Sequence, residues 1–445
     1  MSGKILCTYP AFGINGVQRF VKDLYEEFSR DYEVKLAGVW FDERLEVYKP
    51  NSNVPTIRRA INDEGDYSTR EKIKKDFISL LYSYEPDILH LNTCGMDIEV
   101  LKNIYNYRRN TQQTRIVYTA HSLSFQDFSR NPEYRKIFNI DNEHHPLVRE
   151  LVEISGDIFS QQQHGRKIEL LRKLLTKYNI PIDEERLRIL EIISYVISLQ
   201  NTLLKISDCV IFVSEFLANS AYNNPYVARL INGKSKVIRN GTRMYEIYEN
   251  NRNFIKGKAE KWRREYDFED KFIVGYFGRI TESKGVIDLI DVIRDIVRDG
   301  YKDVVLVMGG PMDEGLEGKI VKEYEDILAS NLFFFEEEQL PKPLSPTGDI
   351  EVALIHSVFD VEVYPSYYET FGLVPLEAVS CMTPTIVRRI DNLVEFEKDG
   401  IVRGFSDKEE LKFLVLEERL RRKIFGEKKK KRGSHKKDGD CEKKV

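Results

Sequence analysis

Residues 361–378 read VEVYPSYYETFGLVPLEA and connect a strand to a helix through a short turn. The apolar run at 361–364 is typical of a buried strand. Pro375 suits the first turn of a helix, where its missing N–H is not needed. A strand that leads through a turn into a helix is the repeating unit of a parallel sheet covered by helices, so this stretch favours an α/β fold.

The same alternation extends in both directions along the chain of 445 residues. Apolar runs of strand length alternate with stretches of helical period, such as the one at 286–297 that ends before Gly300. Two such series predict two doubly wound, Rossmann-like domains facing one another across a cleft, with ligands beyond the carboxyl ends of the strands. The expected strands are at residues 4–9, 34–40, 87–91, 116–119, 209–214, 236–238, 272–277, 304–308, 361–364 and 385–387.

Shifts in composition divide the chain further. A polar stretch at 249–256 is the expected linker, which places the first domain at 1–248 and the second at 249–425. Residues 131–204 break the alternation because they are polar at first and then strongly helical, and we interpret them as a helical insertion in the first domain. The lysine-rich tail at 426–445 has almost no apolar residue and is expected to be disordered.

Charge and cysteine content exclude several functions. The net charge of −4 argues against recognition of a specific nucleic acid. The 5 cysteines are scattered and form no C-x-x-C pair, which argues against a disulfide framework or a zinc site. The chain begins with no signal-peptide pattern, and no stretch approaches the ~20 apolar residues that span a bilayer, so we expect a cytoplasmic protein.

Two glutamates flank the turn between the strand and the helix of the opening stretch. Glu369 lies in the turn and Glu377 in the first turn of the helix, and we expect both to project to one side. Ionised carboxylates accept hydrogen bonds from neighbouring hydroxyls, so the pair suits a hydroxyl-rich ligand. The helix N-terminus attracts phosphate, and Gly372 lets the backbone approach a ligand closely. The alternative is an ordinary turn with two surface glutamates.

Two cations follow the first strand of the second domain. Arg279 ends this strand and Lys284 opens the next helix, so both are expected to project into the cleft. Two fixed cations and a helix N-terminus would stabilise the negative charge that develops on a leaving diphosphate. The alternative is a solvated surface pair.

The first domain offers fewer candidates. His121 lies at the carboxyl end of the strand at 116–119, although a lone histidine is more often structural, which is how we interpret His90. Gly13 and Gly16 would let the first loop pass close to a phosphate, and the alternative for them is a plain turn.

Six segments, in order along the chain, resemble glycosyltransferase family 4, a group of retaining enzymes with the GT-B fold. Glu369 and Glu377 match its Glu-x7-Glu signature. Residues 277–285 (FGRITESKG) resemble its arginine–lysine phosphate loop, and residues 118–121 (YTAH) resemble its strand that ends in a histidine. The remaining landmarks are the glycine loop at 13–19 and the segments at 207–214 and 237–242.

The resemblance implies roles for the matching residues. Glu377 would bind the ribose hydroxyls of the donor, Glu369 and His121 would contact its sugar, and two cations and two glycines would meet its diphosphate. The implied catalytic residues are Glu369, His121, Arg279 and Lys284. The implied donor-binding residues are Gly13, Gly16, Arg279, Lys284, Glu369, Phe371, Gly372, Leu373 and Glu377.

The implied activity is retaining transfer of a hexose-type sugar from a nucleotide-diphosphate sugar to a glycan or lipid-linked acceptor. No cofactor or metal is expected. The favoured scheme is attack from the front face, with the leaving phosphate taking the acceptor proton, so no catalytic base is assigned. Two alternatives stay open: a catalytically silent relative that binds a nucleotide sugar or serves as a partner subunit, and a nucleotide-sugar epimerase.

The chain departs from the family pattern at three places. Met382 stands where the family usually has a small residue, often glycine, and Asp391-Asn392 stand where it often has paired glycines. These changes put the shape of the donor pocket in doubt. Residues 409–425 are expected to supply one helix, where family members commonly end in helices that cross back onto the first domain.

A basic segment at 166–178 carries leucines on one face. Packing of this face within the insertion is the favoured interpretation. The alternative is a peripheral contact with an anionic membrane at its inner face, which a basic amphipathic helix and the tail lysines would support.

Overall fold

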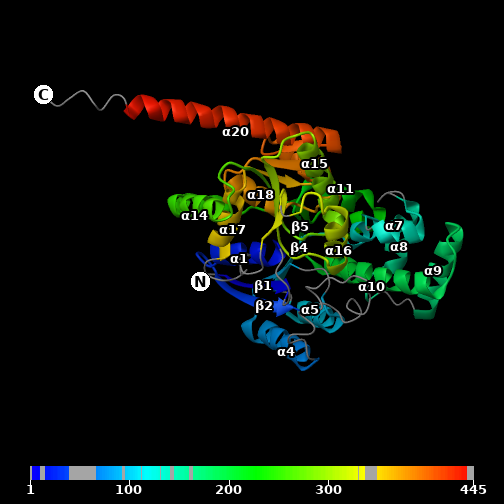
Figure 1. Cartoon of the computed structure of the whole chain (residues 1–445). Coiled ribbons are helices and arrows are strands. Elements are labelled where there is room, and N and C mark those ends of the chain that lie inside the picture. The colour runs from blue at the N-terminus through cyan, green and yellow to red at the C-terminus, as the bar shows by residue number, and fades with distance from the viewer. Residues whose placement is uncertain are drawn as a thin grey trace. The chain divides into compact units, whose positions relative to one another are not determined.

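The computed structural model describes residues 3–10, 16–39, 67–92, 96–111, 113–130, 132–140, 145–159, 164–328, 330–335 and 348–437. Contacts within the chain divide it into two compact units, Met1–Gly241 and Thr242–Val445. Each unit is built on a parallel sheet flanked by helices, as Figure 1 shows. The expected α/β fold with two doubly wound units is therefore confirmed.

The first unit is built on a sheet with the strand order β2-β1-β3-β4-β5-β6. β1 lies between β2 and β3, so that Ile5 pairs with Val34 on one side and with Ile88 on the other. The apolar side chains of β1 are buried, which is why a continuous apolar run could predict this strand. The strands are β1 (Lys4–Pro10), β2 (Glu33–Val39), β3 (Ile88–Leu91), β4 (Arg115–Ala120), β5 (Cys209–Phe212) and β6 (Ser235–Val237).

Helices connect these strands, as the parallel order requires. The predicted insertion contains several of them, and Asn179–Pro181 lie between the end of α9 and the start of α10. The helices of the first unit are α1 (Gly16–Phe28), α4 (Tyr67–Tyr84), α5 (Ile98–Thr111), α6 (Ser124–Arg130), α7 (Pro132–Phe138), α8 (Pro146–Ser155), α9 (His164–Lys177), α10 (Glu184–Ile206), α11 (Glu215–Asn223) and α12 (Pro225–Ile231).

The leucine face of α9 packs inside the insertion. Leu171, Leu174 and Leu175 are at most 2% exposed, and α9 contacts α8 and α10. These leucines are therefore not available for insertion into a membrane. Among the described helices, only α10 is long and apolar enough to cross a bilayer, and the sequence analysis did not identify it as such. However, 67% of its most apolar segment of 18 residues is buried, as in the core helix of a globular unit.

The second unit is built on a sheet with the strand order β12-β11-β10-β7-β8-β9. All of its strand pairs are parallel. Two strands of three residues each, β9 and β12, were not predicted. The strands are β7 (Phe272–Phe277), β8 (Val304–Gly309), β9 (Leu332–Phe334), β10 (Val361–Tyr364), β11 (Thr385–Arg388) and β12 (Arg403–Phe405).

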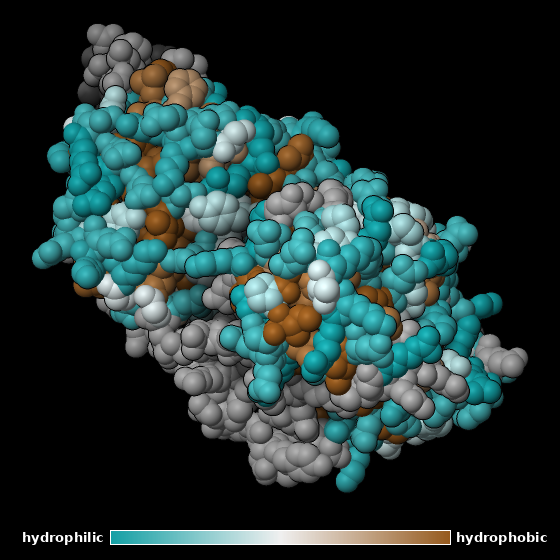
Figure 2. All heavy atoms as spheres, turned by 90° about the vertical axis from the view of Figure 1, so that its right-hand side faces the viewer, coloured by the Kyte–Doolittle hydropathy of each residue, from teal (hydrophilic) through white to brown (hydrophobic). Residues whose placement is uncertain are grey.

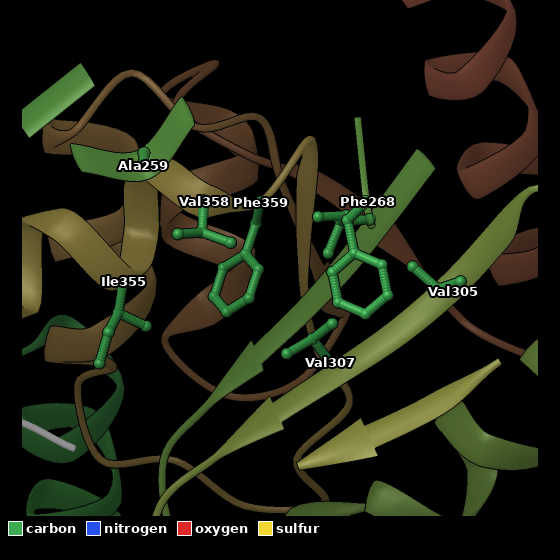
Figure 3. Packing of buried hydrophobic residues seen from close by; sticks show 8 residues of the cluster. Ala259, Phe268, Val305, Val307, Ile355, Val358 and Phe359 are labelled. Atoms are coloured by element: carbon green, nitrogen blue, oxygen red, sulfur yellow. The ribbon is translucent and has the colours of Figure 1, made fainter. Parts of the chain in front are cut away.

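A hydrophobic core joins the helices of the second unit to its sheet. Figure 3 shows Phe359 and Phe268 packed beside Val305 and Val307, which both lie on β8. Gly275 is required in β7, since a Cβ at this position would lie 2.1 Å from the Phe359 ring. The helices are α13 (Met244–Asn250), α14 (Arg252–Glu265), the short 3-10 helix η1 (Glu282–Lys284), α15 (Val286–Arg298), α16 (Glu314–Glu323), α17 (Gly348–Val358), α18 (Leu373–Ser380), α19 (Leu393–Lys398) and α20 (Lys408–Lys437).

The boundary between the units differs from the prediction. It falls after Gly241 and not after residue 248, because Met244 and Tyr248 of α13 are buried against α17 of the second unit. The expected linker at 249–256 is also helical, since it spans the end of α13 and the start of α14. Its polar composition marks the exposed faces of two helices and not a loop.

The prediction for the C-terminus is wrong in part. The expected helix at 409–425 is present, but it continues as α20 to Lys437 through residues that were expected to be disordered. Lysine, arginine and glutamate have good helix propensity, so a helix already anchored on the unit can extend through them. The anchor lies in α20 itself, where Arg419 contacts Asp303 through two hydrogen bonds of 2.9 and 2.6 Å. Residues 438–445 lie outside the described part of the chain.

The described surface is mostly hydrophilic. Figure 2 shows teal residues over most of the visible face, with hydrophobic residues gathered in small patches. A chain in which 31% of the residues are charged is expected to present such a surface.

Candidate functional site

The turn between β10 and α18 depends on a glycine. Gly372 has φ 88° and ends the turn directly before the first residue of α18. Residues with a side chain rarely adopt this conformation, and a Cβ here would lie 2.7 Å from Cδ2 of Leu393. Backbone conformation and packing in the unit therefore require this glycine, whether or not a ligand approaches it.

A second loop, residues 278–285, runs beside this turn. The backbone N–H of Tyr367 donates to the carbonyl of Ser283 at 3.1 Å. Gly285 has φ 68°, and a Cβ on it would lie 2.0 Å from the carbonyl oxygen of Pro365. The two loops follow β10 and β7, which are neighbours in the sheet, so their carboxyl ends meet at one edge.

Lys284 and Glu369 meet where these loops touch. The ammonium of Lys284 donates to Oε1 of Glu369, and the hydroxyl of Ser366 donates to the same oxygen at 3.1 Å. Both charged side chains are 20% exposed, so the pair is shielded but reachable by a ligand. The structure thus brings together the lysine and the first glutamate that the sequence singled out.

Arg279 lies on the same loop with a different environment. Arg279 is exposed to solvent, and its backbone carbonyl accepts a hydrogen bond of 2.6 Å from the hydroxyl of Tyr276. Within the described residues its guanidinium makes no hydrogen bond or ion pair. The expected cation pair is therefore one partly buried lysine and one exposed arginine at the end of β7.

Glu377 lies deeper than expected. It is the fifth residue of α18, beyond the first turn, and it is only 1% exposed, which rules out an ordinary surface glutamate. Its Oε2 lies 4.0 Å from Nε2 of His356 on α17. Nδ1 of His356 is 2.7 Å from Oε1 of Glu362 on β10, and the hydroxyl of Tyr364 donates to the other oxygen of Glu362.

The electrostatics of this buried cluster favour a charged imidazole. Burial alone lowers the pKa of His356, but the carboxylates of Glu362 and Glu377 outweigh it and raise the pKa to about 9. The sequence reading missed His356 and Glu362. The available signal was a glutamate inside the otherwise apolar strand at 361–364, since a buried charge needs a partner.

Phe371 and Leu373 sit in the turn and at the helix start. The Phe371 ring is buried and packs edge-on against Phe396 at a centroid distance of 5.3 Å. The ring therefore does not face solvent. The Phe371 carbonyl accepts a hydrogen bond from the Asn392 amide, and the N–H of Glu369 donates to Oδ2 of Asp391 at 3.3 Å.

The departures from the family pattern have a structural role here. Asp391 and Met382 both adopt positive φ, at 46° and 62°, a conformation that glycine adopts more readily than other residues. Asp391 and its neighbour Asn392 hold the turn that carries Glu369, whereas the Met382 side chain is 55% exposed. The turn that carries Glu369 is therefore braced by side chains that paired glycines would lack.

In the first unit, His121 directly follows β4, as predicted. Its Nε2 is buried and its ring packs edge-on against Phe20 at 5.0 Å. Burial, and then the nearby His90, lower the pKa of His121 to about 3, so it is neutral at pH 7. Nε2 of His90 lies 2.7 Å from the Thr119 hydroxyl, which fits a structural role. Gly16 begins α1, and Gly13 lies outside the described residues.

Comparison with protein families gives one match, located in the second unit. Residues 258–432 match the family described as glycosyl transferases group 1. A D-inositol 3-phosphate glycosyltransferase of Corynebacterium urealyticum is 34% identical over 132 residues, which is 29% of either chain. The capsular polysaccharide biosynthesis glycosyltransferase CapM of Staphylococcus aureus is 28% identical over 187 residues, 40% of this chain and 45% of the relative. The chain thus matches less than half the length of these relatives.

Comparison with solved structures covers nearly the whole chain. Sucrose-phosphate synthase from Thermosynechococcus elongatus aligns with a TM-score of 0.55 at 17% identity, over 93% of this chain and 89% of that one. The catalytic domain of starch synthase IV from Arabidopsis thaliana, bound to ADP and acarbose, aligns with a TM-score of 0.53 at 13% identity, over 89% and 84%. At such identities the likeness shows the fold alone, and that fold is GT-B.

Proposed function

We propose that the protein is a retaining glycosyltransferase that moves a hexose-type sugar from a nucleotide-diphosphate sugar to a glycan or lipid-linked acceptor. The observation that carries the proposal is the contact between Lys284 and Glu369 beside the start of α18, inside the region that matches the glycosyltransferase family. One cation and one carboxylate at the edge of a doubly wound sheet suit a ligand that carries both phosphate and hydroxyl groups.

The diphosphate of the donor would bind at the two adjoining loops. Lys284 would contribute a partly shielded charge and Arg279 an exposed one, and the N-terminus of α18, which follows the turn with Glu369, would also attract phosphate. When the bond from the sugar to the diphosphate breaks, negative charge accumulates on the leaving phosphate. Fixed cations that already surround this position stabilise that charge without rearranging.

The two carboxylates would bind the rest of the donor. Glu369, which Ser366 and Lys284 hold in place, would accept hydrogen bonds from sugar hydroxyls. Glu377 would accept hydrogen bonds from the ribose hydroxyls. The backbone of Phe371, Gly372 and Leu373 would contact the sugar and the phosphate. From the first unit we assign His121, as a neutral imidazole, to the donor sugar, and Gly13 and Gly16 to the diphosphate.

The transfer step needs no protein nucleophile in this scheme. The acceptor oxygen attacks the anomeric carbon from the face that the diphosphate leaves, a new C–O bond replaces the old one, and the acceptor proton moves to the leaving phosphate. No metal or other cofactor is part of the proposal.

The acceptor would be hydroxyl-rich, because relatives are named for transfer to an inositol phosphate and for synthesis of a polysaccharide. We place the reaction in the cytoplasm.

Incubation with UDP-, GDP- and ADP-sugars, with and without bacterial glycan or lipid extracts as acceptors, tests the proposal. Release of the nucleoside diphosphate that depends on the acceptor, with a product of unchanged anomeric configuration by NMR, is the expected result. Binding of a nucleotide sugar without turnover would instead indicate a silent relative or partner subunit. A changed sugar configuration without acceptor would indicate an epimerase.

A further inference from the structure

The buried cluster at α18 contains two residues, His356 and Glu362, that have no role in the transfer scheme. It joins three elements of the second unit, with His356 on α17, Glu362 on β10 and Glu377 on α18. His356 and Glu362 are fully buried, and Glu377 is 1% exposed. Burial of charged groups is costly unless they are paired, so the presence of three in one cluster requires a reason.

Glu362 fixes the orientation of the imidazole ring. Its Oε1 lies 2.7 Å from Nδ1 of His356, and the Tyr364 hydroxyl donates to its other oxygen, so both oxygens of Glu362 are occupied. The ring of Phe277 packs edge-on against the imidazole at 5.6 Å, and the Thr383 hydroxyl donates to the His356 carbonyl at 2.7 Å. The imidazole is thereby held with Nε2 directed at Glu377, at 4.0 Å from Oε2.

We propose that His356, held by Glu362, is the positioning residue of Glu377 and keeps its carboxylate ionised and oriented for the ribose of the donor. This proposal rests on the proposed function, because it concerns the same donor site. Without a neighbouring cation a carboxylate this deeply buried takes up a proton, and a protonated carboxyl can no longer accept a hydrogen bond at each oxygen. A buried imidazolium prevents this protonation.

The groups that face His356 determine how its charge responds to pH. They are Glu362 and Tyr364 on β10 and Glu377 on α18, while β7 contributes only the uncharged Phe277 ring. Tyr248 of α13 and Cys381 after α18 complete the neighbouring apolar cluster. Two carboxylates therefore dominate, and they raise the pKa of His356 to about 9 after burial has lowered it. Donor affinity should then decline as pH rises through about 9.

Calorimetry with UDP, GDP and ADP between pH 6 and 10 tests the proposal. In His356→Asn the amide still donates to Glu362 but carries no charge, and nucleotide affinity at pH 7 should fall about tenfold, as expected for one lost charge-assisted contact. The decline near pH 9 should also disappear. His356→Lys restores a cation and should recover affinity, with the decline moved to higher pH.

A matched control separates positioning from simple damage to the fold. Thr383→Val removes the hydrogen bond to the same histidine but leaves the three charges in place. It should lower the melting temperature without changing nucleotide affinity or its pH profile. Should His356→Asn fail to fold, Glu362→Gln supplies the test, because loss of this carboxylate lowers the pKa of His356 and moves the decline to lower pH.

The outcomes also distinguish this inference from the proposed function. If the wild-type protein binds none of the three nucleotides, the proposed function fails. If it binds one, and His356→Asn or Glu362→Gln binds it with the same affinity and the same pH profile, His356 has no positioning role and the inference is overturned while the function stands.

Discussion

The ammonium of Lys284 contacts the carboxylate of Glu369 across the two loops that follow β7 and β10. A ligand with phosphate and hydroxyl groups can replace this contact with one contact to each residue. We therefore expect Lys284→Met to reduce turnover about 10²- to 10³-fold, as expected for loss of one group that stabilises developing charge. Steady-state kinetics with the active donor would measure this effect.

A nearby ion pair provides the control for Lys284. Nζ of Lys319 on α16 lies 2.7 Å from Oε1 of Glu282, which belongs to the same loop as Lys284. Unlike Lys284 and Glu369, the side chains of Lys319 and Glu282 are exposed to solvent. Lys319→Met should leave turnover unchanged and alter the free energy of unfolding by less than about 1 kcal/mol. Equal losses of turnover in the two variants would contradict a specific role for Lys284.

The ribose assignment of Glu377 predicts a dependence on the ligand. Glu377→Gln keeps the shape of the side chain but removes its charge, whereas Glu377→Ala would also leave a cavity beside His356. We expect Glu377→Gln to weaken nucleotide binding about tenfold. The 2′,3′-dideoxy form of the nucleotide should bind more weakly than the parent nucleotide to the wild-type protein, but equally to the variant. A preserved difference in the variant would exclude the ribose contact.

Much of the fold could be predicted because apolar periodicity reports which residues an element buries. The run at 272–277 matches β7 residue for residue, and the period at 286–297 falls within α15. Strands of three residues show this periodicity poorly, and of these β6 was predicted but β9 and β12 were not. The extension of α20 past residue 425 was missed for a different reason, since composition alone does not reveal that a helix is already anchored.

The candidate site could be predicted only in part. Lys284 and Glu369 were recognised because each lies between a strand and the following helix and matches a segment of the family, whereas the pairing of their strands, β7 and β10, was not predicted. The contact of His356 with Glu362 depends on which buried polar groups meet across α17 and β10. Periodicity does not contain that information. The same holds for Asp391, whose hydrogen bond to the N–H of Glu369 links two loops that are distant in sequence.

The charge of His356 predicts a pH dependence of stability. Burial lowers the pKa of His356, but its carboxylate partners outweigh this effect, so that the pKa rises from 6.5 to about 9 in the folded protein. A group whose pKa is higher in the folded than in the unfolded protein stabilises the folded state fully at any pH below its unfolded pKa. This contribution is lost as the pH rises through the folded pKa. Stability from this group should be complete below about pH 6.5 and should decrease toward pH 9, by on the order of 3 kcal/mol in total.

Urea unfolding at pH 6, 8 and 9.5 for the wild-type protein and His356→Asn would measure this contribution. The variant removes the histidine while every other titrating group stays, so the difference between the two proteins isolates the effect. That difference should shrink as pH rises. A difference that is independent of pH would mean that the histidine is neutral in the folded protein.

The close contact between the two loops that follow β7 and β10 predicts a strong effect at Gly285. Its φ of 68° disfavours any side chain, and a Cβ would lie 2.0 Å from the backbone oxygen of Pro365, which cannot move without shifting the turn that carries Glu369. Gly285→Ala should therefore destabilise the unit by on the order of 2–4 kcal/mol and weaken nucleotide binding as well.

Gly257, inside α14 with nothing within 4 Å of a Cβ, is the matched control. Gly257→Ala should stabilise the protein by about 0.5–1 kcal/mol, because alanine loses less conformational freedom in a helix. Thermal unfolding together with nucleotide titration of both variants would measure these effects, and wild-type nucleotide affinity in a folded Gly285→Ala would show that the contact between the loops does not shape the donor site.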